Sequence, residues 1–162
     1  MDIQYSDIIE GQELHMENVL SFRGKLSATA LNEEMQKINK FISDNELKKT
    51  APTVTITYST EENNQGQIMD IEMLLAIDKP FIPPENCKLK PIFHLTNAVK
   101  IRHIGNPMNL QQTLNRLLEY VDNNGLTTIT GAYNVTVKEV QDHADLNNMI
   151  VDIYVGILPN VI

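Results

Sequence analysis

The chain has 162 residues, of which 42% are hydrophobic and 21% are charged, a composition typical of a folded globular protein and not of a disordered one. The net charge of −8 argues against nucleic-acid binding, because such binding depends on Lys and Arg neutralising phosphates. The single cysteine, Cys87, excludes an internal disulfide and a cysteine-based metal site. The first residues are acidic, unlike a signal peptide, and no apolar run approaches the roughly 20 residues of a membrane span. We therefore expect a cytoplasmic protein without a membrane segment.

The first part of the chain predicts two strands and a helix. Residues 2–9 alternate enough for a short edge strand, and residues 14–23 alternate more clearly between apolar and polar side chains. Ser27 can cap a helix that runs to about Asp44, because its hydroxyl accepts hydrogen bonds from the free N–H groups of the first turn. Asn45 can end this helix in a left-handed conformation.

A hairpin and a connector are predicted next. Residues 53–59 alternate Val54, Ile56 and Tyr58 against polar side chains, and residues 68–77 return as a second strand after a polar loop. Residues 79–91 hold four of the seven prolines and therefore should form neither a helix nor a central strand.

The rest of the chain predicts the same order of elements again. After a strand, Asn106 caps a helix with Pro107 at its first position, where the missing N–H costs nothing. Asn124 and Gly125 end the helix, and residues 132–137 and 150–157 form a second hairpin with a longer loop.

An ungapped comparison of residues 14–47 with residues 93–126 indicates an internal duplication. The offset is 79 residues, and His15 with His94 and Arg23 with Arg102 are identical pairs. We expect the longer loop to shift the offset to 82 in the last strand, which places Asp70 over Asp152. The matching apolar positions are Leu20, Phe22, Leu31, Met35, Ile38, Phe41 and Ile42 in the first copy and Val99, Ile101, Leu110, Leu114, Leu117, Tyr120 and Val121 in the second. The sequence predicts one domain over residues 1–162, with module one at about 14–77, a connector at 78–92 and module two at about 93–157.

Four segments in this order resemble the GyrI-like effector-binding domain family. They are AVKIRHIGNPMN, where the family has an apolar strand followed by Gly-Pro-Tyr, then LLEYVDNNGL at the helix end, AYNVTV, and VDIYVGI in the final strand. The resemblance implies an α+β fold of two β-α-β-β modules, with an antiparallel sheet, two helices on one face and a pseudo-twofold groove on the other. Asn106 before the proline and Gly156 in place of a proline depart from the family pattern.

Strand alternation places charged and aromatic side chains on an exposed sheet face opposite the helices. In the resembled family the groove on this face binds small, often cationic or aromatic, molecules, which implies Asp152 as the acidic residue and Tyr154 as the aromatic one. A carboxylate in a partly apolar groove favours a cation, and a tyrosine ring adds a cation–π contact of about 1 kcal/mol. His15 and His94 could face each other there and titrate near neutral pH. The candidate ligand-binding residues are Asp152, Tyr154, Glu72, Arg102, His15 and His94. The alternative is that these residues are ordinary solvated positions of an amphipathic sheet.

Two functions follow as hypotheses, and a third, that of a hydrolase, would need an activated nucleophile that the sequence does not show. The first is a stand-alone, non-enzymatic domain that binds a small organic molecule, cationic or aromatic, without a metal or other cofactor. Its chain shows no nucleophile motif such as Gly-x-Ser-x-Gly and no phosphate-binding glycine loop. The second is a protein partner, namely an adaptor, chaperone or immunity-like protein of a bacterial type VII secretion or toxin system. Either would be a monomer or homodimer that binds no nucleic acid and no membrane.

Overall fold

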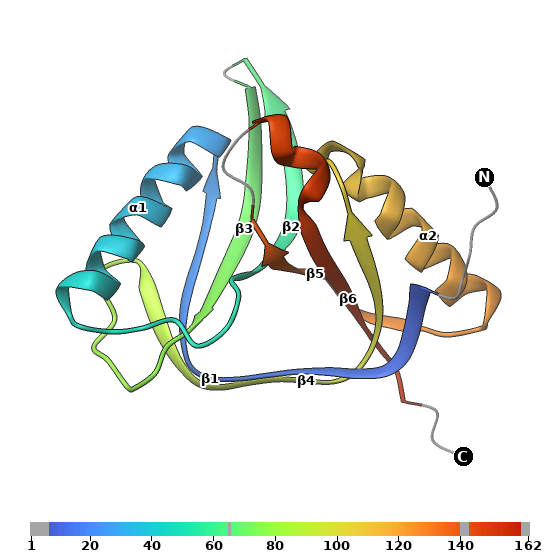
Figure 1. Ribbon diagram of the computed structural model, residues 1–162, viewed down its shortest axis with the longest axis horizontal. Coiled ribbons are helices and arrows are strands. Elements are labelled where there is room, and N and C mark those ends of the chain that lie inside the picture. Colours follow the sequence, from blue (N-terminus) through green and yellow to red (C-terminus); the bar gives the residue numbers. More distant parts are fainter. Residues whose placement is uncertain (1–6, 65, 140–142, 160–162) are drawn as a thin grey trace. The chain divides into compact units, whose positions relative to one another are not determined.

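A computed structural model describes residues 7–64, 66–139 and 143–159, and the order strand, helix, strand, strand occurs twice in them (Figure 1). The elements are β1 (Ile8–Leu26), α1 (Ala28–Asp44), β2 (Val54–Asn63), β3 (Gly66–Ala76), β4 (Cys87–Ile104), α2 (Leu110–Asn123), β5 (Thr128–Lys138) and β6 (Ile150–Ile157). All four strand pairings within the modules are antiparallel. The predicted α+β class and the repeated β-α-β-β order are confirmed. Neither α-helix in the described residues has the length and apolar character to span a membrane.

The chain divides into two compact units. One consists of His15–Phe93 and is called the module-one unit; the other consists of Met1–Leu14 with His94–Ile162 and is called the module-two unit. Within the first, β3 pairs with both β1 and β2, and within the second, β6 pairs with both β4 and β5. The last strand of each module is therefore central, so its side chains have neighbours on both flanks. The predicted groove between the modules stays a prediction.

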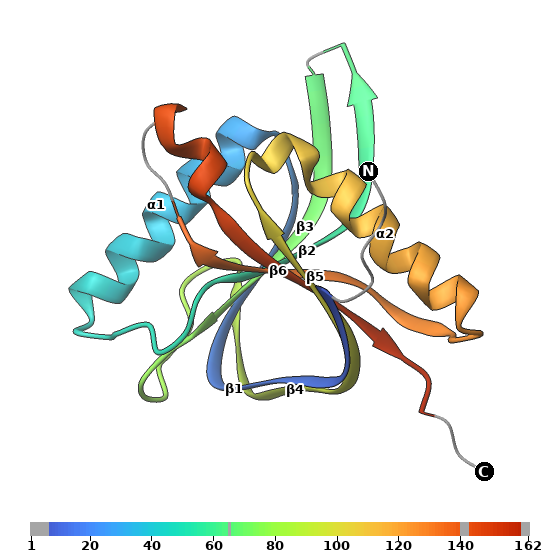
Figure 2. The same cartoon turned by 45° about the vertical axis from the view of Figure 1, so that its right-hand side comes forward.

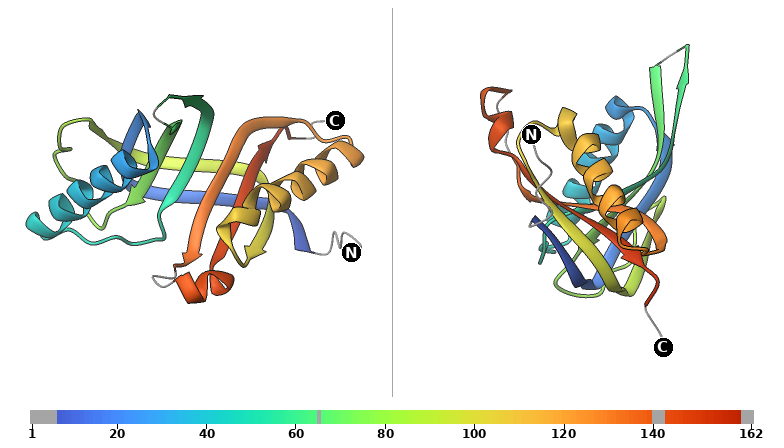
Figure 3. Two further views of the ribbon diagram at one scale, coloured as in Figure 1. Left: turned by 90° about the horizontal axis from the view of Figure 1, so that it is seen from above. Right: turned by 90° about the vertical axis from the view of Figure 1, so that its right-hand side faces the viewer.

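Each unit packs its helix on its own strands through the predicted apolar stripe. The core of the module-one unit consists of Leu20, Phe22, Ile38, Ile42, Leu47, Met73, Leu75 and Ile77. That of the module-two unit includes Val99, Ile101, Leu117, Val121, Val151, Ile153, Val155 and Ile157, so that α2 lies over β4 and β6 (Figures 2 and 3). Four of the predicted repeat pairs, such as Ile38 with Leu117, occupy matching core positions, which supports duplication.

Both ends of α1 and the C-terminal end of α2 agree with the predictions except at one residue. Ser27 accepts a hydrogen bond from the Ala30 backbone N–H at 3.2 Å. Asn45, however, has φ −102°, and the left-handed residue is Glu46 at φ 55°, so the predicted conformation of Asn45 is wrong. Glu46 lies at the repeat position of Gly125, which has φ 66°. In both modules the following residue, Leu47 or Leu126, donates its N–H back to the last helical turn at 2.9 Å, and this bond fixes the conformation.

Helix α2 begins one turn later than predicted. Asn106 accepts a hydrogen bond from the Met108 N–H at 2.9 Å, with Pro107 next to it as expected. The capped segment is a 3₁₀ turn, Pro107–Asn109, and the α-helix proper starts at Leu110.

Strands β1 and β4 begin well before their predicted starts. Strand β1 is continuous from Ile8, so the separate strand predicted at 2–9 is wrong for Ile8 and Ile9, while residues 2–6 lie outside the described residues. Strand β4 begins at Cys87, so the end of the predicted connector is also a strand and includes Pro91. A strand can hold a proline wherever the ladder does not need its N–H. This correction brings Lys88 and Lys90 onto a strand.

The strand register also corrects the predicted repeat offset. Val19 pairs with Ala76, and Ala98 pairs with Gly156. Ala98 follows Val19 by 79 residues and Gly156 follows Ala76 by 80, so the offset in the last strand is 80 rather than 82. Ser59 pairs with Asp70 in the first hairpin, and Lys138 pairs with Ile150 at the corresponding place in the second. The segment between the paired residues is only one residue longer in the second hairpin than in the first. The structural counterpart of Asp152 is therefore Glu72, and the counterpart of Asp70 is Ile150.

Both hairpins contain an irregularity at the same repeat position. The register shifts between Thr57 and Ser59 in β2 and between Thr136 and Lys138 in β5, which leaves Tyr58 and Val137 as counterparts. A bulge of this kind redirects the side chain at the extra residue. Tyr58, predicted in line with Val54 and Ile56, is instead 45% exposed.

We expect Gly156→Ala to lower the free energy of unfolding by about 1–3 kcal/mol, because overpacking a core strand costs this much. A Cβ at Gly156 would lie 2.8 Å from Thr130 Cγ2 and 2.9 Å from Leu95 Cδ1. Urea denaturation measures the change. The second change Thr130→Ser removes Cγ2 and keeps the Oγ that accepts from the Gly156 N–H at 2.8 Å. It should restore part of the loss, and equal stability of Gly156→Ala and wild type would contradict the packing argument.

Candidate functional site

Each module places an arginine directly across from a carboxylate on its central strand. Arg23 pairs in register with Glu72, and Arg102 pairs in register with Asp152. Glu72 is 8% exposed and Asp152 is 4% exposed. Both carboxylates were predicted on an exposed face, so this part of the prediction is wrong. Burial makes their charge costly unless partners compensate it, and the two modules do this differently.

In the module-two unit the arginine forms an ion pair with the carboxylate opposite it. Arg102 donates from Nε to Asp152 Oδ1 at 2.8 Å and from Nη2 to Oδ2 at 3.1 Å, and Lys100 Nζ lies 3.5 Å from Oδ2. Two parallel N–H···O bonds are the strongest arrangement between these groups. The bond to Asp152 raises the pKa of Arg102 above its usual value. Asp152 therefore has its charge compensated by its own module.

Tyr154 lies beside this pair. Burial and the neighbouring charge of Asp152 raise its pKa, and Lys100 Nζ lies 5.8 Å from the ring centroid. Three of the predicted site residues, Asp152, Arg102 and Tyr154, thus come from adjacent strands of one unit.

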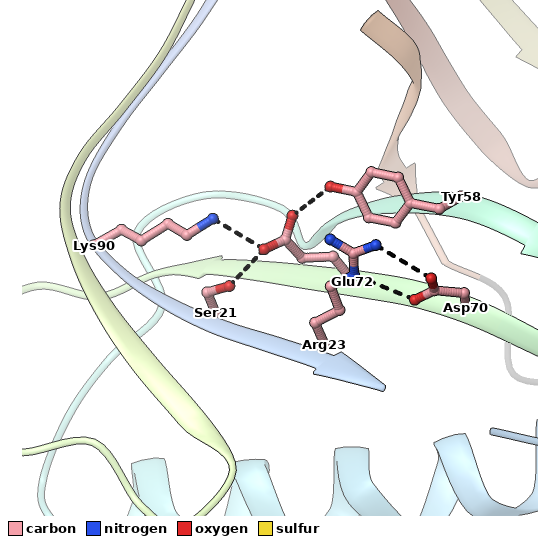
Figure 4. A network of polar contacts seen from close by, with 6 residues as sticks. All are labelled: Ser21, Arg23, Tyr58, Asp70, Glu72 and Lys90. Atoms are coloured by element: carbon pink, nitrogen blue, oxygen red, sulfur yellow. Dashed lines mark hydrogen bonds and ion pairs between the residues drawn. The ribbon is translucent and has the colours of Figure 1, made fainter. Parts of the chain in front are cut away.

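In the module-one unit the arginine, Arg23, bonds to a second acid, Asp70, instead of the carboxylate opposite it. Arg23 donates from Nε to Asp70 Oδ1 at 3.2 Å and from Nη2 to Oδ2 at 3.1 Å, diagonally across the strands (Figure 4). This hydrogen bonding holds the pKa of Asp70 below its usual value. Ile150 occupies the corresponding place in the other module, where Arg102 has no such second acid in its register neighbours. Glu72 is consequently left to other donors.

Glu72 accepts three hydrogen bonds, from three different strands. Ser21 Oγ and Lys90 Nζ donate to Oε2 at 2.8 and 2.9 Å, and Tyr58 Oη donates to Oε1 at 2.9 Å (Figure 4). Burial acts to raise the pKa of Glu72, but the bonds from Lys90, Ser21 and Tyr58 together hold it below its usual value. The carboxyl group is therefore ionised at neutral pH, and of these three donors only Lys90 is a cation.

A cavity of about 440 Å³ opens at this network, and we call it the Glu72 cavity. Arg23 lies with its guanidinium carbon 3.9 Å from the centroid of the Tyr58 ring, as a stacked pair in the wall. The lining residues are Ser21, Arg23, Tyr58, Glu72, Asn86, Lys88 and Lys90. A buried carboxylate, an aromatic ring and several cations thus face a space large enough for a small organic molecule.

The two predicted histidines occupy different units. His15 is exposed and lines a second cavity, of about 500 Å³, together with Glu17, Asn18 and Asp78. His94 Nε2 lies 2.9 Å from Glu13 Oε2. Their predicted pairing across a groove stays a prediction. No group of three or more metal-binding side chains occurs within the described ranges.

Sequence reasoning missed three members of the Glu72 network. Ser21 was one polar residue among several in β1, and Tyr58 was placed on the apolar face of β2 because a bulge leaves no trace in the alternation. Lys90 was assigned to the connector because of its neighbouring proline. The alternating segment Lys88-Leu89-Lys90 was the one signal that could have indicated a strand there.

A family model described as the GyrI-like small molecule binding domain matches residues 12–158. No curated protein sequence matches the chain.

Several solved structures share the fold at low sequence identity. The EcmrR C-terminal domain is 17% identical with a TM-score of 0.73, and the match covers 93% of this chain and 96% of that domain. The EcmrR chain in a complex with DNA gives the same identity and TM-score, but only 56% of it is covered, so this chain spans little more than half of that chain's length. A structure described as a hydrolase from Listeria innocua is 13% identical, with a TM-score of 0.61 and coverage of 93% of this chain and 90% of the other. These likenesses show the fold alone.

The pKa of Glu72 predicts how stability depends on pH. Its value is lower in the folded than in the unfolded chain, so its stabilising contribution is present above the unfolded value of about 4.3 and is lost as the pH falls through the folded value. We expect the free energy of unfolding to fall more steeply between pH 5 and pH 3 in the wild type than in Glu72→Gln, measured by urea denaturation at each pH. Glu61→Gln, at an exposed position of β2 outside the network, is the matched control. Equal slopes for wild type and Glu72→Gln would contradict the assignment.

Proposed function

Because the chain belongs to the GyrI-like small molecule binding domain family, we propose that it is a non-enzymatic domain that binds a small organic molecule in the Glu72 cavity. The preferred ligand carries a cationic group and an aromatic ring. The cation binds at Glu72, and the ring packs beside Tyr58.

The observation that carries this proposal is that Arg23, which lies opposite Glu72 in the strand register, bonds to Asp70 and not to Glu72. Because Arg23 forms its ion pair with Asp70, Glu72 forms its ion pair in the described residues with a single lysine, Lys90, whose side chain is 38% exposed. A lysine holds a carboxylate as a flexible point charge, whereas an arginine holds it through a rigid fork. A ligand cation can therefore take the place of the Lys90 ammonium, while Ser21 and Tyr58 continue to donate to the carboxylate.

A cation is required at this position for an electrostatic reason. A buried carboxylate without a charged partner is strongly unfavourable, so Lys90 can leave only when another cation replaces it. A neutral ligand would gain nothing from Glu72. The exchange selects for positive charge in the ligand.

An aromatic group in the ligand fits the neighbouring wall. Tyr58 already stacks with Arg23 at 3.9 Å, so a flat polarisable surface lies next to the carboxylate. Rings prefer offset or edge contacts with such surfaces and gain about 0.5–1.5 kcal/mol beyond the area they bury.

Asp152, the anchor expected from the sequence, is less suited to this exchange. A ligand would have to displace the bidentate Arg102 and compete with Lys100, losing two charge-assisted bonds. We therefore move the proposed anchor from Asp152 to its counterpart Glu72 and assign Asp152, Arg102 and Tyr154 a supporting role in the module-two unit.

We expect aromatic cations such as benzyltrimethylammonium and benzamidinium to raise the melting temperature of the wild type and to bind measurably by calorimetry. Glu72→Gln should weaken the binding by about tenfold or more, because the charged partner is lost. Asp152→Asn, measured at a temperature where it remains folded, should bind like the wild type.

Two outcomes would contradict the proposal. One is the absence of binding by every aromatic cation tested at millimolar concentration. The other is the reverse pattern in the variants, with affinity lost in Asp152→Asn and kept in Glu72→Gln, which would place the anchor in the module-two unit.

A further inference from the structure

The Glu72 cavity carries more positive than negative charge. Its lining includes three cationic side chains, Arg23, Lys88 and Lys90, and one carboxylate, Glu72. The charge of Arg23 is matched by Asp70 and that of Lys90 by Glu72. Lys88 is exposed and forms no ion pair within the part of the chain that the structure describes. One positive charge in the lining is thus uncompensated before any ligand enters.

Entry of a cation increases this excess. The ligand replaces the Lys90 ammonium at Glu72, but Lys90 remains attached to β4, two residues from Lys88 on the same strand. Residues two apart in a strand point to the same side of the sheet. Two ammonium groups then border the cavity beside a ligand that is itself positive, and this repulsion works against a ligand whose only charge is positive.

Resting on the proposed function above, we propose that the ligand is an aromatic zwitterion, a molecule in which an aromatic ring, a protonated amine and a carboxylate are combined. The amine binds at Glu72, the carboxylate binds at Lys88 and Lys90, and the ring lies beside Tyr58. Each charged group of the cavity then has a partner of opposite sign: Glu72 the amine, the two lysines the carboxylate, and Arg23 its own Asp70.

The two simpler charge types each leave a conflict. A cation without a carboxylate satisfies Glu72 and leaves Lys88 and Lys90 uncompensated. An anion satisfies the lysines but approaches the ionised Glu72, which keeps Lys90 partly engaged. The zwitterion resolves both conflicts, since the acid and the two lysines lie around one cavity.

The test compares three molecules that share a phenyl ring and differ in charge. They are phenylalanine as the zwitterion, 2-phenylethylamine as the cation and 3-phenylpropanoate as the anion. Binding is measured by calorimetry and by chemical-shift changes in the full chain at neutral pH. We expect phenylalanine to bind about tenfold or more tightly than either of the others.

Variants separate the two subsites. Glu72→Gln should weaken both phenylalanine and 2-phenylethylamine. Lys88→Gln should weaken phenylalanine selectively and leave 2-phenylethylamine unchanged or slightly tighter, because it removes a like charge. Lys138→Gln, at an exposed position of β5 in the other unit, is the matched control and should leave both affinities unchanged.

Failure of this inference is distinguishable from failure of the proposed function. Binding of 2-phenylethylamine or of 3-phenylpropanoate as tight as that of phenylalanine would overturn the zwitterion, and so would an equal loss of phenylalanine and 2-phenylethylamine affinity in Lys88→Gln. Binding of the aromatic cations with no binding of phenylalanine would overturn the zwitterion alone. Absence of binding by all of these molecules would overturn both.

Discussion

The candidate site depends on one constraint, the placement of an arginine on the first strand of a module opposite a buried carboxylate on its last strand. Both modules place these two groups opposite each other, Arg23 with Glu72 and Arg102 with Asp152. In the module-two unit Arg102 donates two parallel hydrogen bonds to Asp152. In the other, Asp70 two residues earlier attracts the arginine and leaves the buried acid to a lysine, a serine and a tyrosine. The difference at one repeat position, Asp70 against Ile150, therefore explains why Arg102 bonds to the acid opposite it whereas Arg23 bonds to Asp70.

The energetics of a buried carboxylate explain why this difference matters. Removing its cation costs several kcal/mol, so the carboxylate stays paired at all times, and what varies is how readily one cation replaces another. A bidentate arginine must break two bonds and lose a fixed orientation, whereas a lysine breaks one bond and moves away on a flexible chain. The neutral donors Ser21 and Tyr58 also stabilise the ionised acid, and under the proposed function they continue to donate to it while one cation replaces another. The module-one unit thus keeps Glu72 paired, but through a lysine, which is displaced more easily than a bidentate arginine.

The sequence predicted the parts of the fold that depend on local periodicity. Apolar stripes placed both helices and their cores, Ser27 and Asn106 gave the caps, and the 79-residue offset related the modules. Features that arise only on strand pairing were missed. The offset of 80 in the last strand follows from the strand register. The exposure of Tyr58 follows from a bulge in β2, and the contact of Lys90 with Glu72 follows from a strand that continues through Pro91. The left-handed Glu46 was missed because the returning Leu47 N–H, and not an intrinsic preference of Asn45, decides which residue adopts that conformation. Of the six candidate site residues, two are the carboxylates Glu72 and Asp152, and alternation alone could not show that one pairs with a lysine and the other with an arginine.

Duplication supplies a scaffold in which corresponding positions can take different roles. The two hairpins keep a register shift at the same place, yet one bulge carries Tyr58 and the other Val137, so a hydroxyl reaches the acid in only one module. Ser21 likewise corresponds to Lys100, which adds a second cation to Asp152, where the other module has only a hydroxyl. The differences at Ser21 and at Asp70 leave Glu72 with one cation where Asp152 has two, whereas the Tyr58 to Val137 difference gives Glu72 a hydrogen bond that Val137 cannot supply to Asp152. None of them alters the strands or the helices. The two buried acids are therefore paired differently through changes in side chains at corresponding positions of one shared order of strands and helices.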